Sequence, residues 1–191
     1  MKNFKINEHK GIISNEFLIR EIDNFLDACK FIAELPYKRN SDKNEIKCVF
    51  YDFGGTCSTK HATLRKLALE NDQKNVHLML GIFKMDSEYT VKIDDTLKKF
   101  KLKYIPEAHN YLKIDQQYFD FTNDHSDYSQ FQSKILTEVE IEYDQINLEK
   151  ITFHKDYLRT WILDEKIPYN LEQLWNIREK CIADLQKVDE V

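Results

Sequence analysis

The stretch Gly54-Gly55-Thr56-Cys57-Ser58-Thr59-Lys60-His61 follows an apolar, aromatic run at Cys48–Phe53 and opens a helical pattern. Two adjacent glycines can take backbone angles closed to other residues, so they permit an abrupt change of direction. Thr56 suits the N-cap position, because its hydroxyl can accept a hydrogen bond from an N–H group of the first helical turn. The stretch therefore predicts a sharp turn followed at once by a helix.

Cys57 is expected in the first turn of this helix, which should continue to about Glu70. Unpaired N–H groups and the positive end of the helix dipole meet there. Such a position favours the thiolate, the form of cysteine that attacks carbonyl carbon. The alternative is that Cys57 is one more small buried hydrophobic residue. The glycine turn, the cap and two partners further along the chain favour a nucleophile.

Composition predicts one folded domain over residues 1–191. The chain is 42% hydrophobic and 13% aromatic, and few glycines and prolines leave little room for linkers. Its net charge of −5 and the lack of a Lys/Arg block argue against a nucleic-acid partner. No segment approaches eighteen apolar residues, so we expect neither a signal peptide nor a membrane partner.

The cysteines show no paired spacing, which argues against a disulfide framework. They are Cys29, Cys48, Cys57 and Cys181. Isolated cysteines of this kind are typical of a reducing compartment, so we expect a cytoplasmic protein.

Helices are predicted at both ends of the chain. Ser14 or Asn15 can cap a helix that runs to about Leu35, where a proline follows. Asn170 and Gln173 form a capping-box pattern for a last helix. That last helix places the following apolar residues on one side: Leu174, Ile177, Cys181, Leu185 and Val188.

Between these helices the apolar patterns predict mainly strands. The expected strands are Val76–Phe83, Ile105–Leu112, Tyr118–Thr122 and Ile135–Tyr143, with one more allowed at Glu88–Ile93. A short helix is expected at Tyr157–Leu163, and residues 94–103 are ambiguous. Glu138, Glu140 and Glu142 alternate with apolar residues in their strand, so we expect them on a solvated face.

His109 and Asp120 are the partners that a cysteine nucleophile would need, namely a base and an acceptor that orients it. Asp120 lies between two phenylalanines, where partial burial of a carboxylate calls for a partner. If His109 and Asp120 lie opposite each other in a hairpin, the turn centres between Ile114 and Asp115. The polar residues of this segment are there, so the register is self-consistent.

Three alternatives remain open for these side chains. His109 and Asp120 can be a structural pair beside an unrelated cysteine. His61, one helical turn from Cys57, can be the base, although a base on the same helix leaves little room for a carbonyl, and packing below the site suits it better. Cys57, His61 and His109 can hold a metal, but no second cysteine pair supports this.

At this point the chain resembles the transglutaminase-like family of the papain-like cysteine-enzyme superfamily. The resemblance covers about Gly54 to Thr122: Gly-Thr-Cys57 opens a helix, His109 enters a strand, and Asp120-Phe-Thr122 closes the next strand. It implies a single transglutaminase-like domain over residues 1–191, with its core at about 45–145. The implied fold is α+β, with the cysteine helix packed on an antiparallel sheet and with flanking terminal helices. It also implies acyl transfer or amide hydrolysis through a thioester, with the triad order Cys, His, Asp. The short hairpin and the lack of a Trp near the histidine depart from the family and bear on substrate preference.

The expected chemistry places an oxyanion beside the N–H of Cys57, with Tyr51 and Asn110 as candidates for a second donor. Arg39 and Asn40 could bind an anionic substrate group, although such a loop pair is often only solvated surface. No cofactor and no metal are expected. The substrate would be a peptide, a protein side chain or a small amide, and the oligomeric state is left open. The alternative function is a non-catalytic relative that keeps the fold and binds a peptide or protein partner.

Overall fold

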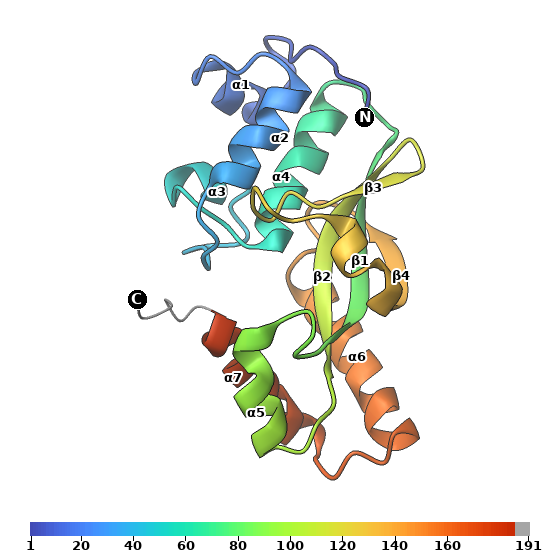
Figure 1. The fold of residues 1–191 in the computed structure, drawn as a ribbon. Coiled ribbons are helices and arrows are strands. Elements are labelled where there is room, and N and C mark those ends of the chain that lie inside the picture. The colour runs from blue at the N-terminus through green and yellow to red at the C-terminus, as the bar shows by residue number, and fades with distance from the viewer. Residues whose placement is uncertain (186–191) are drawn as a thin grey trace.

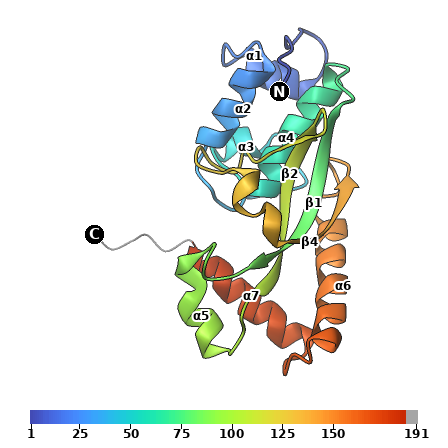
Figure 2. The same ribbon diagram turned by 45° about the vertical axis from the view of Figure 1, so that its right-hand side comes forward.

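The structure, a computed structural model of the chain, describes residues 1–185, which form an α+β fold. A long twisted sheet runs through the molecule and carries helices at both ends (Figures 1 and 2). The α-helices are α1 (Ile12–Leu18), α2 (Phe25–Glu34), α3 (Cys48–Tyr51), α4 (Cys57–Glu70), α5 (Asp94–Lys99), α6 (Leu148–Asp164) and α7 (Leu171–Leu185). The strands are β1 (Val76–Met85), β2 (Ile105–Ile114), β3 (Gln117–Phe119) and β4 (Ile135–Ile141), and the 3₁₀ helices are η1 (Val91–Ile93), η2 (Tyr128–Gln130) and η3 (Gln132–Lys134).

Strand β1 lies inside the sheet and is buried on both faces. The strand order is β3-β2-β1-β4, and neighbouring strands are antiparallel. β1 pairs with β2 over its whole length, from Val76 opposite Ile114 to Met85 opposite Ile105. The nearly continuous apolar run at Val76–Phe83 is the pattern of such a doubly covered strand, and the prediction of a central strand is confirmed.

Two hydrophobic clusters cover the two faces of the sheet. Even-numbered residues of β1, such as Leu78 and Leu80, pack with α1 to α4. Odd-numbered residues, such as Met79 and Phe83, pack with α5, α6 and α7. This alternation follows from the period of two in a strand. Figure 1 shows α1–α4 at one end of the sheet and α5–α7 at the other, so the start of α4 lies between the two groups of helices.

The N-terminal segment forms two helices, so the prediction of one helix from Ser14 or Asn15 to Leu35 is wrong. Asn24 interrupts it, because its side chain accepts from the N–H of Asp27 at 3.1 Å and caps α2. Asparagine competes in this way for backbone donors that a continuous helix would need. The first helix is capped from elsewhere: the Glu70 carboxylate accepts from the N–H of Ser14 at 2.7 Å.

The C-terminal capping box is confirmed, with Asn170 and Gln173 bonded to each other in both directions at 2.9 and 3.0 Å. The apolar residues Leu174, Ile177 and Cys181 of α7 are buried. Val188 lies outside the described residues. The preceding helix, α6, begins at Leu148, nine residues before the predicted start at Tyr157.

Two strand predictions need correction. The segment Glu88–Ile93 is not a strand but leads through η1 into α5. In β4, Glu138 is not simply solvated, because it accepts hydrogen bonds from the hydroxyls of Tyr111 at 2.5 Å and Tyr118 at 2.7 Å. Its neighbour Glu140 is exposed, as expected.

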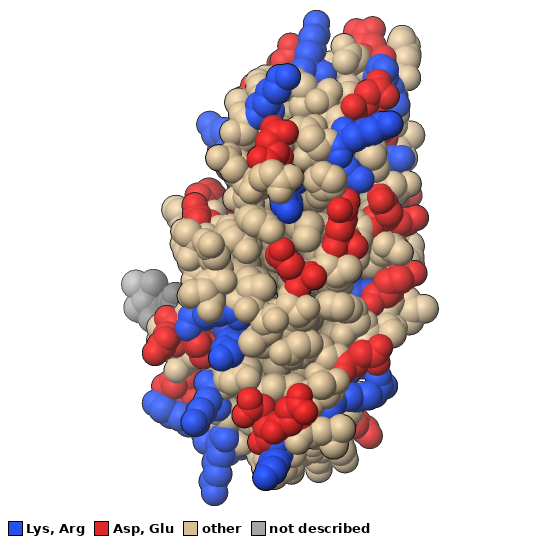
Figure 3. Space-filling model, turned by 90° about the vertical axis from the view of Figure 1, so that its right-hand side faces the viewer, with Lys and Arg blue, Asp and Glu red and all other residues tan. Residues whose placement is uncertain are grey.

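No helix among the described residues is long and apolar enough to cross a membrane. On the face shown in Figure 3, acidic and basic side chains are interspersed, and the basic ones form no continuous area. A nucleic-acid footprint on this face would require such an area.

Candidate active site

The turn before α4 brings Cys57 into the middle of the molecule. Neither Gly54 nor Gly55 has a positive φ; the left-handed residue of the turn is Phe53, with a φ of 49°. The glycines are needed for space instead: a Cβ on Gly54 would lie 2.8 Å from the carbonyl oxygen of Pro36, and one on Gly55 would lie 2.7 Å from Thr59 Oγ1. The predicted role of their backbone angles is therefore wrong, and close packing explains them.

The predicted helix start is confirmed. Thr56 is the N-cap of α4 and forms a capping box with Thr59, whose Oγ1 accepts from the N–H of Thr56 at 3.0 Å. Cys57 is the first residue of the helix and is 7% exposed. The remaining turns of α4 are buried against the sheet, so the position of the thiol is well defined.

The hairpin that carries His109 and Asp120 has a different register from the predicted one. Ile114 pairs with Gln117, so the turn centres between Asp115 and Gln116, both of which have positive φ. Relative to the prediction, each paired residue of β2 lies opposite a residue two positions further along the partner strand. A shift of two keeps the side chains on their predicted faces, but His109 and Asp120 are not opposite each other. Pairing ends at Phe119, and Asp120 lies just beyond the strand.

Asp120 nevertheless bonds His109, because the chain turns sharply after β3. Its Oδ2 lies 2.8 Å from Nε2 of His109. Its Oδ1 accepts from Thr122 twice, from the N–H at 2.9 Å and from the hydroxyl at 2.5 Å. The buried ammonium of Lys60 holds the same turn through the carbonyl oxygen of Thr122 at 2.6 Å. Three hydrogen bonds from two residues, His109 and Thr122, therefore orient the carboxylate, and Lys60 holds Thr122 in place.

His61 lies below the site and bonds main-chain groups with both ring nitrogens. The N–H of Phe121 donates to Nε2 at 2.8 Å, which assigns the proton to Nδ1, and Nδ1 lies 2.7 Å from the carbonyl oxygen of Cys57. Burial lowers the pKa of His61 to about 4. The ring is therefore neutral and structural in this arrangement, as the preferred reading of the alternatives expected. Within residues 1–185, no cluster of three His, Cys, Asp or Glu side chains is arranged to hold a metal ion.

The thiol of Cys57 lies at the open edge of β2. Of the described strands, β3 reaches only residues 112–114 of this edge, so the rest of the edge is left for α4. The side chain of His109 and the main-chain N–H of Asn110 lie beside the thiol there, and both lower its pKa. His109 packs against Phe83 and Phe131 on the face of the sheet away from most of α4. Because Cys57 is at the edge and not over a face, the two side chains still meet.

On the other side of the thiol lies Lys150 of α6. Its Nζ is 3.8 Å from Cys57 Sγ, 2.8 Å from Ser58 Oγ and 2.8 Å from Asn110 Oδ1. His109 and Lys150 thus place positive charge on two sides of one sulfur atom.

These charges determine the protonation of the site. Burial by itself favours the neutral thiol, but Lys150 and His109 outweigh it and lower the pKa of Cys57 to about 5. Burial likewise opposes the imidazolium, but Asp120 and the Cys57 thiolate raise the pKa of His109 to about 10. At neutral pH the pair is therefore thiolate and imidazolium. The pKa of Asp120 is held below its usual range, against its burial, chiefly by His109.

Two cavities meet at Cys57. The first, which we call the Lys150 cavity, has a volume of about 480 Å³ and charged walls that include Lys43, Lys150 and Arg178. The second, the His109 cavity, has a volume of about 500 Å³ and is lined in part by Phe83 and other apolar side chains. A carbonyl group can therefore approach the sulfur with one substituent in each cavity.

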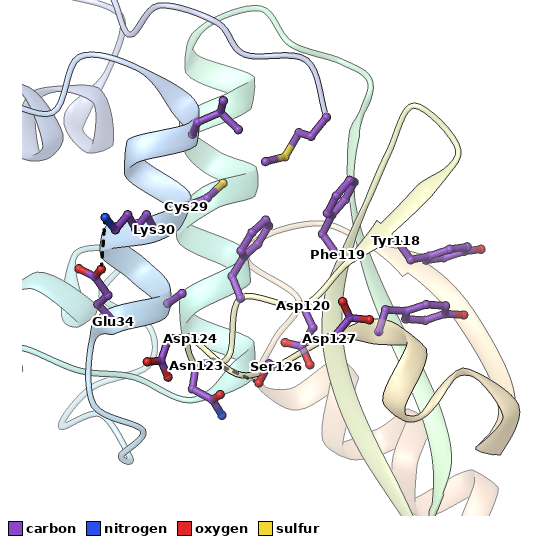
Figure 4. Close-up of a pocket in the computed structure, with 15 residues that line it drawn as sticks. Cys29, Lys30, Glu34, Tyr118, Phe119, Asp120, Asn123, Asp124, Ser126 and Asp127 are labelled. Atoms are coloured by element: carbon purple, nitrogen blue, oxygen red, sulfur yellow. Dashed lines mark hydrogen bonds and ion pairs between the residues drawn. The ribbon is translucent and has the colours of Figure 1, made fainter.

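A third cavity of about 550 Å³ lies behind Asp120, between α2 and the segment after β3. Figure 4 shows Asp124 and Asp127 around it together with Asp120, and Lys30 paired with Glu34 on α2. Cys57 does not line this cavity. This cavity therefore gives a substrate no direct contact with the thiol.

The loop residues expected to bind an anion have partners within the protein. Asn40 donates to Asp52 Oδ2 and to the carbonyl oxygen of Gly54, both at 2.9 Å, so it holds the glycine turn. Arg39 lines the Lys150 cavity, and its guanidinium bonds Glu179 at 2.6 Å. Both residues line the Lys150 cavity, where Asn40 holds the glycine turn and the charge of Arg39 is compensated by Glu179.

Neither candidate for the second oxyanion donor points its side-chain donor at the thiol. Tyr51 is 56% exposed, lies under the ammonium of Lys47 and lines none of the three cavities. The Asn110 amide donates to the carbonyl oxygen of Met79 at 3.0 Å, and its oxygen accepts from Lys150.

Lys150 was missed because α6 was predicted to begin at Tyr157. With the observed start, Lys150 lies on the same stripe as His154, Leu158 and Trp161, at helical spacings of three and four. These three are buried, and a lysine in line with them was the available signal.

Comparison of the chain with protein-family models, with curated proteins and with solved structures found no match. The proposals below therefore rest on the residues and their geometry.

Proposed function

We propose that the protein is a cysteine-dependent acyltransferase or amide hydrolase that works through a thioester, with Cys57, His109 and Asp120 as its triad. The resemblance to the transglutaminase-like family and a papain-like core belong to this proposal. The observation that carries it is the position of the Cys57 thiol at the start of a helix, where it lines two cavities and shares one of them with His109. A structural cysteine has no need of a charged histidine and a carboxylate behind it.

The first half of the reaction acylates Cys57. The thiolate adds to the carbonyl carbon of an amide, a C–S bond forms, and the electron pair of the C=O bond moves onto oxygen. When the oxyanion collapses, the C–N bond breaks and imidazolium His109 gives its proton to the leaving amine. The Asp120 carboxylate accepts a hydrogen bond from Nε2 of His109, which leaves the other ring nitrogen, Nδ1, to exchange protons at the thiol.

The second half releases the acyl group. Water or a second amine gives a proton to His109 and attacks the thioester carbon, and the C–S bond breaks to restore thiolate and imidazolium. Because His109 exchanges protons with both the leaving amine and the incoming nucleophile, these groups belong in the His109 cavity. The acyl substituent then lies in the Lys150 cavity, whose polar walls suit a peptide, a protein side chain or a small amide.

The test is capture of the acyl-enzyme with p-nitrophenyl acetate, an activated ester that requires no recognition of a leaving group. We expect one acetyl group per chain on Cys57, detected by intact-protein and peptide mass spectrometry. Cys57→Ala should give none, and His109→Gln should slow acetylation strongly. His9→Gln is the matched control, because the His9 side chain is 94% exposed and lines none of the three cavities.

Addition of excess methylamine distinguishes the two reaction types. Formation of N-methylacetamide at the expense of acetate indicates transfer, and unchanged acetate release indicates hydrolysis. Wild-type protein that is folded but not acetylated at Cys57 would contradict the proposal and favour the alternative of a binding protein with this fold.

A further inference from the structure

Lys150 has one N–H bond left for a ligand beside Cys57. An ammonium carries three donors. Ser58 Oγ and Asn110 Oδ1 each accept one of them at 2.8 Å, from two different elements, and so fix the position of Nζ. The remaining contact is the thiol at 3.8 Å, which is long for an acceptor that already interacts with His109 and with the N–H of Asn110.

Apart from the Cys57 thiolate itself, the charge of Lys150 is not paired with an anionic group at hydrogen-bond distance within the described residues. Within the described part of the chain its close contacts are a hydroxyl, an amide oxygen and the sulfur, and none is a carboxylate. The nearby guanidinium of Arg178 differs in this respect, because it bonds Glu107 at 2.7 Å and Glu179 at 2.5 Å. When negative charge moves from the sulfur to a carbonyl oxygen, the ammonium of Lys150 can therefore interact with that oxygen.

We propose that Lys150 is the second oxyanion donor of the site, acting together with the main-chain N–H of Cys57. This inference rests on the proposed thioester chemistry. When the C–S bond forms, the negative charge moves from Sγ to the former carbonyl oxygen, two bonds away. An oxyanion donor acts at about 2.7–3.1 Å from that oxygen. An ammonium 3.8 Å from the sulfur, with one donor still available, is within reach of it.

Ser58 and Asn110 are then positioning residues for Lys150. Asn110 is itself fixed through its amide, which donates to the carbonyl oxygen of Met79 in the neighbouring strand. The oxyanion would lie on the Lys150 side of the sulfur, opposite His109. This placement turns the leaving amine toward His109, as the proton transfer requires.

The experiment compares two reactions of Cys57 that differ only in whether an oxyanion forms. Iodoacetamide alkylates the thiolate by displacement of iodide, with no charge on a carbonyl oxygen. p-Nitrophenyl acetate acylates it through a tetrahedral oxyanion and releases p-nitrophenolate. Both rates are measured for wild type, Lys150→Met and Lys43→Met over a range of pH. They are compared where the alkylation profile shows each thiol to be fully ionised. Lys43 is the matched control, because it lines the same cavity, is exposed and carries the same charge.

We expect Lys150→Met to acylate about 100-fold more slowly than wild type per thiolate, the effect of removing one oxyanion donor. Its alkylation rate per thiolate should change less than threefold, which also shows that the site is folded. Lys43→Met should lose much less acylation per thiolate than Lys150→Met, because Lys43 lines the cavity without contacting the sulfur.

Equal loss of both rates per thiolate, or no loss of acylation, overturns the role of Lys150 while the proposed function stands. Wild-type Cys57 that alkylates but is not acylated overturns both. If Lys43→Met slows acylation as much as Lys150→Met does, the effect comes from positive charge anywhere in the cavity. This result also overturns the inference.

Discussion

Asp120 Oδ2 lies 2.8 Å from His109 Nε2, although Asp120 is one residue beyond the end of β3 and is not paired with His109 across the hairpin. The contact depends on the turn at Thr122, whose N–H and hydroxyl both donate to the other carboxylate oxygen. The orientation of a side chain in the site is thus determined by donors that follow it in the chain.

The variant Asp120→Asn tests the different partners of the two carboxylate oxygens, because Thr122 donates to Oδ1 and His109 bonds Oδ2. The two donors of Thr122 should hold the amide oxygen, so the NH₂ group should face His109 and force its proton onto the nitrogen that serves the thiol. We expect the pKa of Cys57 to rise and its alkylation at neutral pH to slow. The change in unfolding free energy should be small, because the two side chains are nearly isosteric. An alkylation profile identical to that of wild type would make Asp120 a structural residue and reduce the triad to Cys57 and His109.

Alkylation by iodoacetamide should be selective for Cys57. Its pKa is lowered to about 5, so the thiolate forms as the pH rises through that value and is complete at neutral pH. Burial raises the pKa of Cys29, Cys48 and Cys181, which stay neutral and unreactive. Peptide mass spectrometry at pH 6.5 should find one modified cysteine. Modification of several cysteines, or a midpoint near the ordinary thiol pKa of about 8.5, would contradict the ion pair.

The variant Cys57→Ala should keep the fold and lose all acyl chemistry. Alanine is the best helix former, and Thr56 still caps α4, so the midpoint of thermal unfolding by circular dichroism should change by only a few degrees. Without the thiolate, His109 loses one of the two charges that raise its pKa, which should fall from about 10. Histidine NMR titration measures this. Turnover by the variant, once a substrate is known, would place the chemistry elsewhere.

His61→Leu separates a structural histidine from a base. Leucine leaves the buried N–H of Phe121 without its partner, which should cost about 1–3 kcal/mol in urea unfolding at pH 7. The carbonyl oxygen of Cys57 keeps its main-chain hydrogen bond within α4. The thiol pKa should stay well below its ordinary value, because His109 and Lys150 remain. His109→Gln is the comparison and should raise the thiol pKa. A thiol pKa raised more by His61→Leu than by His109→Gln would identify His61 as the base.

The loss of stability in His61→Leu should shrink as the solution is acidified. The pKa of His61 is about 4 in the folded protein and about 6.5 when unfolded, so between these values the unfolded wild type binds more protons. Wild type therefore loses stability as the pH falls through this window, and the variant lacks this contribution. Urea unfolding of both proteins at pH 7 and pH 4.5 measures the difference, and a gap that stays constant or widens would show that His61 is not held neutral.

The local features of the site could be read from the sequence because short-range chemistry determines them. Thr56 caps α4 wherever that helix packs, and the apolar run of β1 requires cover on both faces. The faces of the hairpin were also predictable, because a period of two survives a register shift of two residues. Tyr111 and Tyr118 accordingly share a face, with ring centroids 5.9 Å apart.

Tertiary structure alone decided which groups surround the thiol. Lys150 is 93 residues from Cys57 in the chain, and Thr122 acts through a turn that no periodic pattern reveals. Asn110 and Asn40, which looked like substrate contacts, are used to hold Lys150 and the glycine turn. A buried polar group needs a partner, but any chain segment that packs beside it can supply one. The sequence therefore pointed to Cys57, His109 and Asp120 as a proposed triad, whereas the packing of α6 against the edge of β2 determined that Lys150 lies beside the thiol.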